Sequence, residues 1–92
     1  MALAKEFYIL FFEETKKDLR AVEVHAKNAE WSDVSLLAHR IRGRSRIMSF
    51  AEFEELCTEV ERSASVGGQT DIDSKIAAVH AAFEARRKKE LG

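Results

Sequence analysis

Proline is absent from the 92 residues of this chain, and only four residues are glycine. Proline and glycine are the residues that most often end helices and form tight turns, so their scarcity favours long helices over a β-sandwich or barrel. Apolar residues make up 46% of the chain and charged residues 34%, which is ordinary globular composition. A chain of this length buries roughly 60–65% of its unfolded surface, enough for one modest core. We therefore expect an all-α fold in a single domain over residues 1–92.

The charges of the chain nearly cancel, with 15 basic and 16 acidic residues. This balance gives no overall reason to bind nucleic acid or a membrane. The only cysteine, Cys57, excludes an internal disulfide and fits a reducing compartment. The longest apolar run, at residues 7–12, is far shorter than the ~20 residues that cross a bilayer, and no secretory signal pattern is present. We expect a cytoplasmic, monomeric domain without membrane contact.

Apolar residues recur at intervals of three and four along most of the chain, which predicts four amphipathic helices. The first covers residues 2–28 and is the longest, with a polar break at Thr15. Its expected buried face consists of Phe7, Leu10, Phe11, Leu19, Val22 and Ala26. Four such helices joined by short links make an antiparallel up-down four-helix bundle with a long first helix.

Side chains that cap helix N-termini set the expected boundaries of the other helices. The predicted N-caps of the second, third and fourth helices are Ser32, Ser49 and Thr70. Trp31 and Leu36 occupy the positions of a hydrophobic staple around the first of these caps, and residues 49–52 have the pattern of a capping box. Residues 63–69, which include two adjacent glycines, are the expected linker before the fourth helix.

His39 has an unusual place on the second helix. At 100° per residue, it points away from the apolar face of that helix, which consists of Val34, Leu37, Ala38, Ile41, Ser45 and Met48. The residues that share its face are Ser35, Arg42, Gly43 and Arg46, with Arg40 and Arg44 on the flanks. Glycine inside a helix costs about 1 kcal/mol relative to alanine. Because the apolar pattern continues past Gly43, we interpret this residue as an opening for a partner's approach to His39, and not as a helix C-cap.

The segment His-Arg-Ile-Arg-Gly-Arg-Ser at residues 39–45, preceded by Leu-Ala, resembles the signature of histidine-containing phosphotransfer (HPt) domains. Residues 53–61 resemble the helix that follows it in that family, and the resemblance covers nearly the whole chain. The chain also departs from the family at three positions. Arg42 replaces the usual lysine, Arg44 stands where a small residue is common, and Ser49 stands where glycine is usual.

The resemblance implies a phosphorelay intermediate and not an enzyme. His39 would accept a phosphoryl group from an aspartyl phosphate on one receiver domain and pass it to an aspartate on another. Arg42 would stabilise the phosphoryl charge and Gly43 would give access, while Ser35, Arg40 and Arg46 would contact the partner. The resemblance further implies that the receiver supplies Mg²⁺, so no cofactor is expected on this chain. The expected partners are receiver domains and a sensor histidine kinase, and the chain is either a free protein or a domain of a hybrid kinase.

Two other hypotheses follow from the arginines. The bulk of Arg44 could hinder a receiver's approach, which leaves open a binding module that docks a receiver or kinase without carrying phosphate. A nucleic-acid binder would use the arginines at positions 40, 42, 44 and 46, but these spiral around the helix and acidic helices surround them. No metal site is expected, because no two histidines and no Cys-His pair have a ligand spacing. We predict that His25 and His80 are ordinary helix residues and that Cys57 lies in the core.

Overall fold

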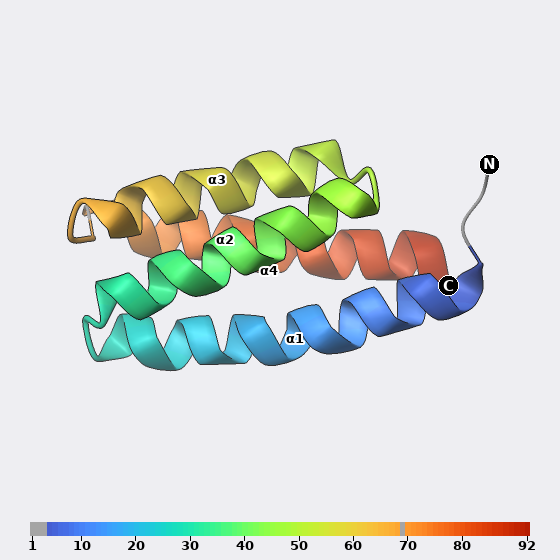
Figure 1. The fold of residues 1–92 in the computed structure, drawn as a ribbon, viewed down its shortest axis with the longest axis horizontal. Coiled ribbons are helices and arrows are strands. Elements are labelled where there is room, and N and C mark those ends of the chain that lie inside the picture. Colours follow the sequence, from blue (N-terminus) through green and yellow to red (C-terminus); the bar gives the residue numbers. More distant parts are fainter. Residues whose placement is uncertain (1–3, 69) are drawn as a thin grey trace.

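The chain folds into a bundle of four helices (Figure 1). The computed structural model describes residues 4–68 and 70–92, so the predicted helix start at residue 2 and the linker end at residue 69 lie outside the described residues. The helices are α1 (Lys5–Lys27), α2 (Trp31–Ile47), α3 (Ala51–Ser65) and α4 (Ile72–Leu91). They run alternately in opposite directions, and α1 is the longest, with 23 residues. The predicted all-α four-helix bundle is confirmed.

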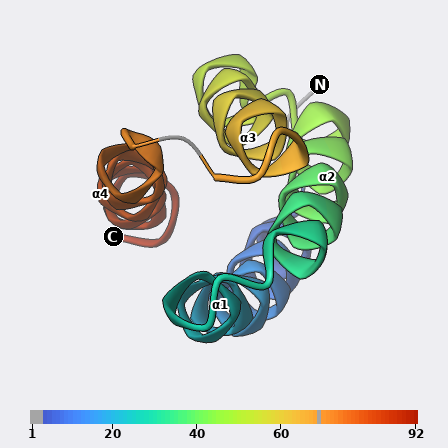
Figure 2. The same cartoon turned by 90° about the vertical axis from the view of Figure 1, so that its left-hand side faces the viewer.

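The position of α2 in the bundle exposes one of its faces. Viewed along the bundle, α2 lies between α1 and α3, and α4 closes the ring on the far side (Figure 2). The packing of α2 on α3 is the most extensive in the structure. The side chains of α2 that fill the core are Val34, Leu37, Ala38, Ile41 and Ser45. The opposite face of α2 is therefore left to solvent along the middle of the bundle.

The buried face of α1 differs from the predicted one in its first half. Phe7 and Leu10 are exposed, at 57% and 56%, whereas Phe12 is buried. The reason is Thr15, which is fully buried and continues the apolar face instead of interrupting it. A threonine tolerates this position because its hydroxyl oxygen accepts a hydrogen bond from Arg44 at 3.0 Å. With Thr15 inside, the buried face of α1 includes Phe12 and leaves out Phe7 and Leu10.

Aromatic rings fill the end of the core near the start of α1. The Phe11 ring packs edge-on against Phe50 with centroids 5.1 Å apart, and Phe12 packs against Phe83 of α4 at 5.6 Å. Tyr8 is partly buried, and its ring centroid lies 6.1 Å from that of Phe50. These rings come from α1, α4 and the link before α3, so they hold three parts of the bundle together.

The links between helices explain why the predicted N-caps are wrong. After α1, the Glu30 N–H donates to the His25 carbonyl at 2.9 Å and the Ala29 N–H to the Ala26 carbonyl at 3.1 Å, which is a Schellman motif. Ala29 has the left-handed φ of 54° that this motif requires. The residue that ends the motif, Glu30, is already the N-cap of α2. No residue is left between the two helices for a serine cap.

The same motif follows α2 and α3. Ser49 and Gly67 take the left-handed position, with φ values of 62° and 91°. Consequently the N-cap of α3 is Phe50, and no side-chain hydrogen bond caps this helix. Helix α3 also continues to Ser65, so residues 63–65 are helical and do not belong to the linker.

The remaining predicted boundaries also change. The N-cap of α4 is Asp71, one residue after Thr70, again without a side-chain hydrogen bond. Leu36 is 60% exposed, so the predicted hydrophobic staple does not form. Trp31 lies in the first turn of α2 and packs partly buried against the core. A Cβ atom placed on Gly68 would lie 2.4 Å from its ring, so the turn after α3 passes directly over this tryptophan.

Candidate functional site

His39 lies in the middle of α2 on the face left open by the bundle. Its side chain is 59% exposed, as the helical pattern predicts. The ring nitrogen Nδ1 lies 2.8 Å from Oε2 of Glu61 on α3 and 3.1 Å from Nη2 of Arg42. The other ring nitrogen, Nε2, makes no hydrogen bond with another described residue. Among the described residues, the imidazole is thus held through Nδ1 alone.

Glu61 is the site residue that the sequence analysis did not single out. Its side chain is only 22% exposed and lies between α3 and α2. Besides its contact with His39, its Oε1 atom lies 3.4 Å from Arg42 Nε. Oε1 is buried and has no hydrogen-bond partner of good geometry among the described residues. One signal was available in the sequence: Glu61 follows the buried Cys57 by four residues, at the edge of the buried face of α3.

Gly43 lies inside α2, one turn after His39. The helix continues past it to Ile47, and the C-cap is Met48, so the prediction that Gly43 is not a C-cap is confirmed. A Cβ atom placed on Gly43 would have no neighbour within 4 Å. A hollow opens at this point of the surface, lined by His39, Arg42, Gly43, Arg46 and Glu54. The structure therefore gives unobstructed space beside the imidazole.

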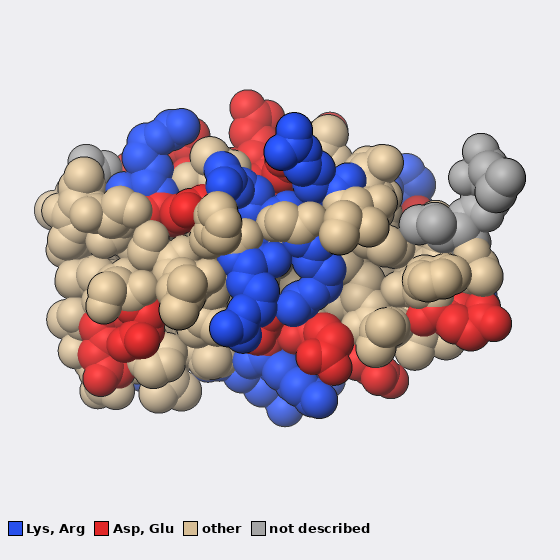
Figure 3. All heavy atoms as spheres, in the orientation of Figure 1, with Lys and Arg blue, Asp and Glu red and all other residues tan. Residues whose placement is uncertain are grey.

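The four arginines of α2 point in different directions. Arg44 donates to Thr15 at 3.0 Å and to Asp18 at 2.9 Å, so its guanidinium turns toward α1. Arg40 lies 3.6 Å from the same aspartate and is 56% exposed. Arg46 makes no ion pair with a described residue. Basic side chains gather across the middle of this face, with acidic groups around them (Figure 3).

The ion pairs of the arginines on α2 bear on the hypothesis of a nucleic-acid binder. Arg40, Arg42 and Arg44 are each paired with a carboxylate, which does not favour a nucleic-acid binder that uses all four arginines.

Ser35, predicted to contact a partner, lies on the same face as His39. Its hydroxyl makes a hydrogen bond of 3.0 Å with the hydroxyl of Ser65 and so connects α2 to α3.

Two other side chains that the sequence analysis named, Cys57 and His80, do not line the hollow beside His39. Burial, followed by the charges of Glu54 and Glu61, raises the pKa of the Cys57 thiol to about 12, so this residue is an inert part of the core as predicted. His80 lies 2.8 Å from Glu23 and connects α4 to α1.

Three metal-ligating side chains lie together at the link between α1 and α2. His25 Nδ1 is 2.8 Å from Glu30 and 3.8 Å from Asp33. The sequence did not reveal this group, because its members come from a helix end and the start of the next helix. All three are partly or largely exposed, and Glu30 already accepts the hydrogen bond of His25. The prediction that the chain holds no metal ion stays a prediction.

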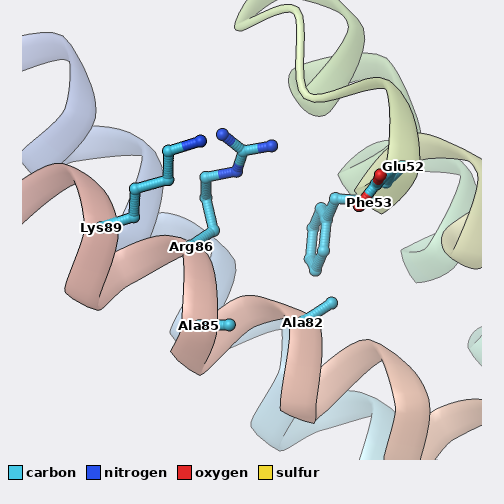
Figure 4. Close-up of a pocket in the computed structure, with 6 residues that line it drawn as sticks. All are labelled: Glu52, Phe53, Ala82, Ala85, Arg86 and Lys89. Carbon is cyan, nitrogen blue, oxygen red and sulfur yellow. The ribbon is translucent and has the colours of Figure 1, made fainter.

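A second hollow lies between the start of α3 and the end of α4 (Figure 4). Its lining residues are Glu52, Phe53, Ala82, Ala85, Arg86 and Lys89. The guanidinium of Arg86 packs 4.5 Å from the centre of the Phe50 ring, so it covers the aromatic end of the core. None of the residues around His39 contributes to this hollow.

An exposed histidine on the second helix of a bundle, with a glycine one turn later, agrees with a match to a known family. Residues 6–89 match the family described as the Hpt domain. The chain belongs to the Hpt domain family. No match was found among curated proteins or among solved structures.

The Hpt match confirms the resemblance seen in the sequence. Hpt domains are phosphotransfer modules of two-component phosphorelays, in which they interact with receiver domains and kinases. This Hpt domain thus takes part in a phosphorelay. Among the described residues, no helix is long and apolar enough to cross a membrane.

Proposed function

We propose that this Hpt domain is a phosphorelay intermediate that carries a phosphoryl group on His39. The group comes from an aspartyl phosphate on one receiver domain and passes to an aspartate on another. The observation that supports this most directly is the setting of the imidazole: Glu61 contacts Nδ1, no described residue bonds Nε2, and His39 lines the hollow beside Gly43. A neutral imidazole is a nucleophile near neutral pH.

The transfer step is a displacement at phosphorus. The lone pair of His39 Nε2 forms the N–P bond, the P–O bond to the donor aspartate breaks, and the aspartate carboxylate leaves with the bonding electrons. Transfer to the second receiver is the reverse reaction at a different aspartate. Such reactions depend on positioning and on stabilising the charge of the phosphoryl oxygens. The receiver is expected to contribute Mg²⁺ and the acidic pocket, and we assign no metal ligand to this chain.

The residues around His39 have separate roles in this proposal. Arg42, whose guanidinium already reaches the imidazole, stabilises the phosphoryl oxygens by charge-assisted hydrogen bonds. Gly43 lets the receiver's loop approach the ring. The exposed Arg40 and Arg46 attract the acidic surface of the receiver. Ser35 contributes to the contact surface while its hydroxyl stays with Ser65.

The alternative of docking without phosphate rested on the bulk of Arg44. The guanidinium of this residue turns toward α1 and bonds there, so it does not cover His39. No other feature of the described residues favours that alternative.

The test is phosphate transfer to the purified domain from a phosphorylated receiver. We expect acid-labile phosphate on the wild-type domain and on the His25→Gln and His80→Gln variants. The His39→Gln variant should take up none, while its helical circular dichroism stays unchanged. Label on His39→Gln, or loss of label in either of the other two variants alone, would contradict the assignment.

A further inference from the structure

The link between α1 and α2 brings together three side chains of types that commonly bind metal ions. His25 lies in the last turn of α1, Glu30 is the N-cap of α2, and Asp33 lies in the first turn of α2. Nδ1 of His25 is 2.8 Å from Oε1 of Glu30 and 3.8 Å from Oδ2 of Asp33. The three ligand atoms all lie within 4.8 Å of one another. One imidazole nitrogen and two carboxylate oxygens thus converge on one point of the surface.

The spacing of these atoms fits a tetrahedral ion. Zn²⁺ binds histidine nitrogens and carboxylate oxygens at about 2.0–2.2 Å, and tetrahedral geometry then sets its ligand atoms about 3.3–3.6 Å apart. The two distances from His25 Nδ1 lie on either side of that range. Small rotations of the side chains are therefore enough to bring all three atoms onto one ion. The side chains of His25, Glu30 and Asp33 are 33%, 47% and 52% exposed, which leaves the fourth position open to water.

The backbone around this group is already ordered. The Glu30 N–H donates to the His25 carbonyl at 2.9 Å, and the Val34 N–H donates to the Glu30 carbonyl at 3.2 Å. These hydrogen bonds fix the end of α1 relative to the start of α2, so the binding of an ion orders only side chains. A preorganised site loses less entropy on binding and therefore holds its ligand more tightly.

The charges at the link also favour a cation. Among the residues that the structure describes, neither Glu30 nor Asp33 forms an ion pair with a lysine or an arginine. The two carboxylates repel each other at this separation, and a neutral imidazole does not compensate for their charge. The positive end of the α2 dipole offsets part of that charge, whereas a divalent cation cancels it in full.

We propose that His25, Glu30 and Asp33 form a Zn²⁺ site that fastens the end of α1 to the start of α2. Mg²⁺ and Ca²⁺ prefer ligand sets made of oxygen, so the histidine selects a transition metal ion. The Nδ1 lone pair binds the ion, and the proton that His25 shares with Glu30 moves to Nε2 or, from a charged ring, to solvent. One histidine with two carboxylates differs from the histidine pairs and the Cys-His pair whose absence led us to expect no metal site.

This site is separate from the proposed phosphoacceptor. None of its three ligands lines the hollow beside His39, so the ion takes no part in the transfer step, and the inference does not depend on the proposed function. The effect of the ion is on the stability of the domain. Because the unfolded chain does not hold the three ligands together, Zn²⁺ binds the folded domain preferentially and so stabilises it.

Calorimetric titration of the whole domain with ZnCl₂ at pH about 7.5, where histidine is mostly neutral, tests the site. We expect saturable binding of one ion per domain, and a rise in Tm with Zn²⁺ but not with Mg²⁺. His25→Ala, Glu30→Gln and Asp33→Asn should each weaken binding by at least ~10-fold, since even the loss of a group that only orients a ligand costs about 10–100-fold. His39→Gln and His80→Gln, which remove the two other histidine–carboxylate contacts, are the matched controls and should bind as the wild type does.

The NMR signals of the ring nitrogens give a readout that needs no variant. In isotopically labelled wild-type domain, the first additions of Zn²⁺ should change the Nδ1 signal of His25 and leave the signals of His39 and His80 in place. The absence of saturable binding to the wild type, or an affinity that all three ligand variants retain, would overturn the inference. Loss of binding in His39→Gln with unchanged binding in His25→Ala would overturn it as well, because the ion would then lie at the phosphoacceptor.

Discussion

The guanidinium of Arg44 donates a hydrogen bond to the Asp18 carboxylate at 2.9 Å and so fastens α2 to α1. On the other flank of α2, the His39 side chain lies 2.8 Å from the carboxylate of Glu61 on α3. The helix that carries the candidate phosphoacceptor is thus held by polar contacts on both sides. The first contact concerns the stability of the bundle, and the second concerns the chemistry of the imidazole.

We expect Arg44→Ala to destabilise the bundle and to leave transfer intact. The substitution removes donors from Asp18, which is 13% exposed, and from the buried hydroxyl of Thr15. Losing hydrogen bonds of this kind costs about 1–2 kcal/mol in free energy of unfolding. Urea denaturation should show this loss, with Arg46→Ala, which makes no ion pair with a described residue, as the control. Faster phosphotransfer in Arg44→Ala would instead support the idea that this side chain obstructs the receiver.

Substitution of Gly43 should separate access from stability. Alanine at a helix interior is about 1 kcal/mol more favourable than glycine, and the space over Gly43 is open. Gly43→Ala should therefore raise the free energy of unfolding by up to about 1 kcal/mol, and Gly43→Leu should leave it equal or slightly higher. Transfer should slow modestly in the first variant and severely in the second, because the larger side chain fills the hollow beside His39. A marked loss of stability in Gly43→Leu would contradict this.

Ser49→Gly should stabilise the protein. Ser49 is exposed and has a φ of 62°, a conformation that costs an L-residue about 1–2 kcal/mol and glycine almost nothing. The greater freedom of glycine in the unfolded chain offsets about 0.4–1 kcal/mol of this gain. We expect a net increase of about 0.5–1 kcal/mol in thermal or urea denaturation. The reverse exchange, Gly67→Ser at a φ of 91°, should be destabilising. An unchanged or lower stability of Ser49→Gly would show that the strain at this turn is relieved in another way.

This turn also shows which parts of the fold the sequence could and could not predict. The number of helices, their antiparallel order and the exposure of His39 follow from helical periodicity, because that pattern sets which side of each helix is buried. Helical periodicity does not predict the residues at which the helices begin. In all three links the first helix ends in a Schellman motif, and after α1 and α2 the last residue of the motif caps the next helix. The serines, which are good caps in isolation, have no free position there.

Helical periodicity also does not predict the contacts of the candidate site, for a different reason. A helical wheel places His39 and Arg42 on one face, since both belong to α2. It cannot state which residue of α3 or α1 stands opposite, because that depends on how far one helix is shifted along the other. Glu61 beside His39, and Thr15 beneath Arg44, are results of that shift. Thr15 was expected to be a polar break in the first helix and Glu61 was not singled out, yet both side chains contact α2.

The last prediction concerns the division of work between Arg42 and Arg46. Arg42 reaches the imidazole at 3.1 Å, whereas Arg46 lies one turn farther along α2, at the edge of the hollow. Arg42→Ala should lower the maximal rate of transfer, and Arg42→Lys should largely restore it, because the ammonium keeps the charge next to the phosphoryl oxygens. Arg46→Ala should instead weaken association with the receiver and reduce its dependence on salt, and the maximal rate should stay unchanged.

Rapid-mixing transfer assays over a range of receiver concentrations distinguish these two effects. The maximal rate reports the step at phosphorus, and the concentration for half-maximal rate reports docking. Repeating the series at low and high salt measures the electrostatic contribution to docking, because an exposed charge such as Arg46 is screened within about 10 Å at 0.1 M salt. Arg40→Ala is the informative comparison, since Arg40 is exposed but already lies 3.6 Å from Asp18, so its loss should weaken docking less than the loss of Arg46. An equal fall of the maximal rate in Arg42→Ala and Arg46→Ala would mean that the arginines act as one diffuse basic surface, and that Arg42 has no particular contact with the phosphoryl group.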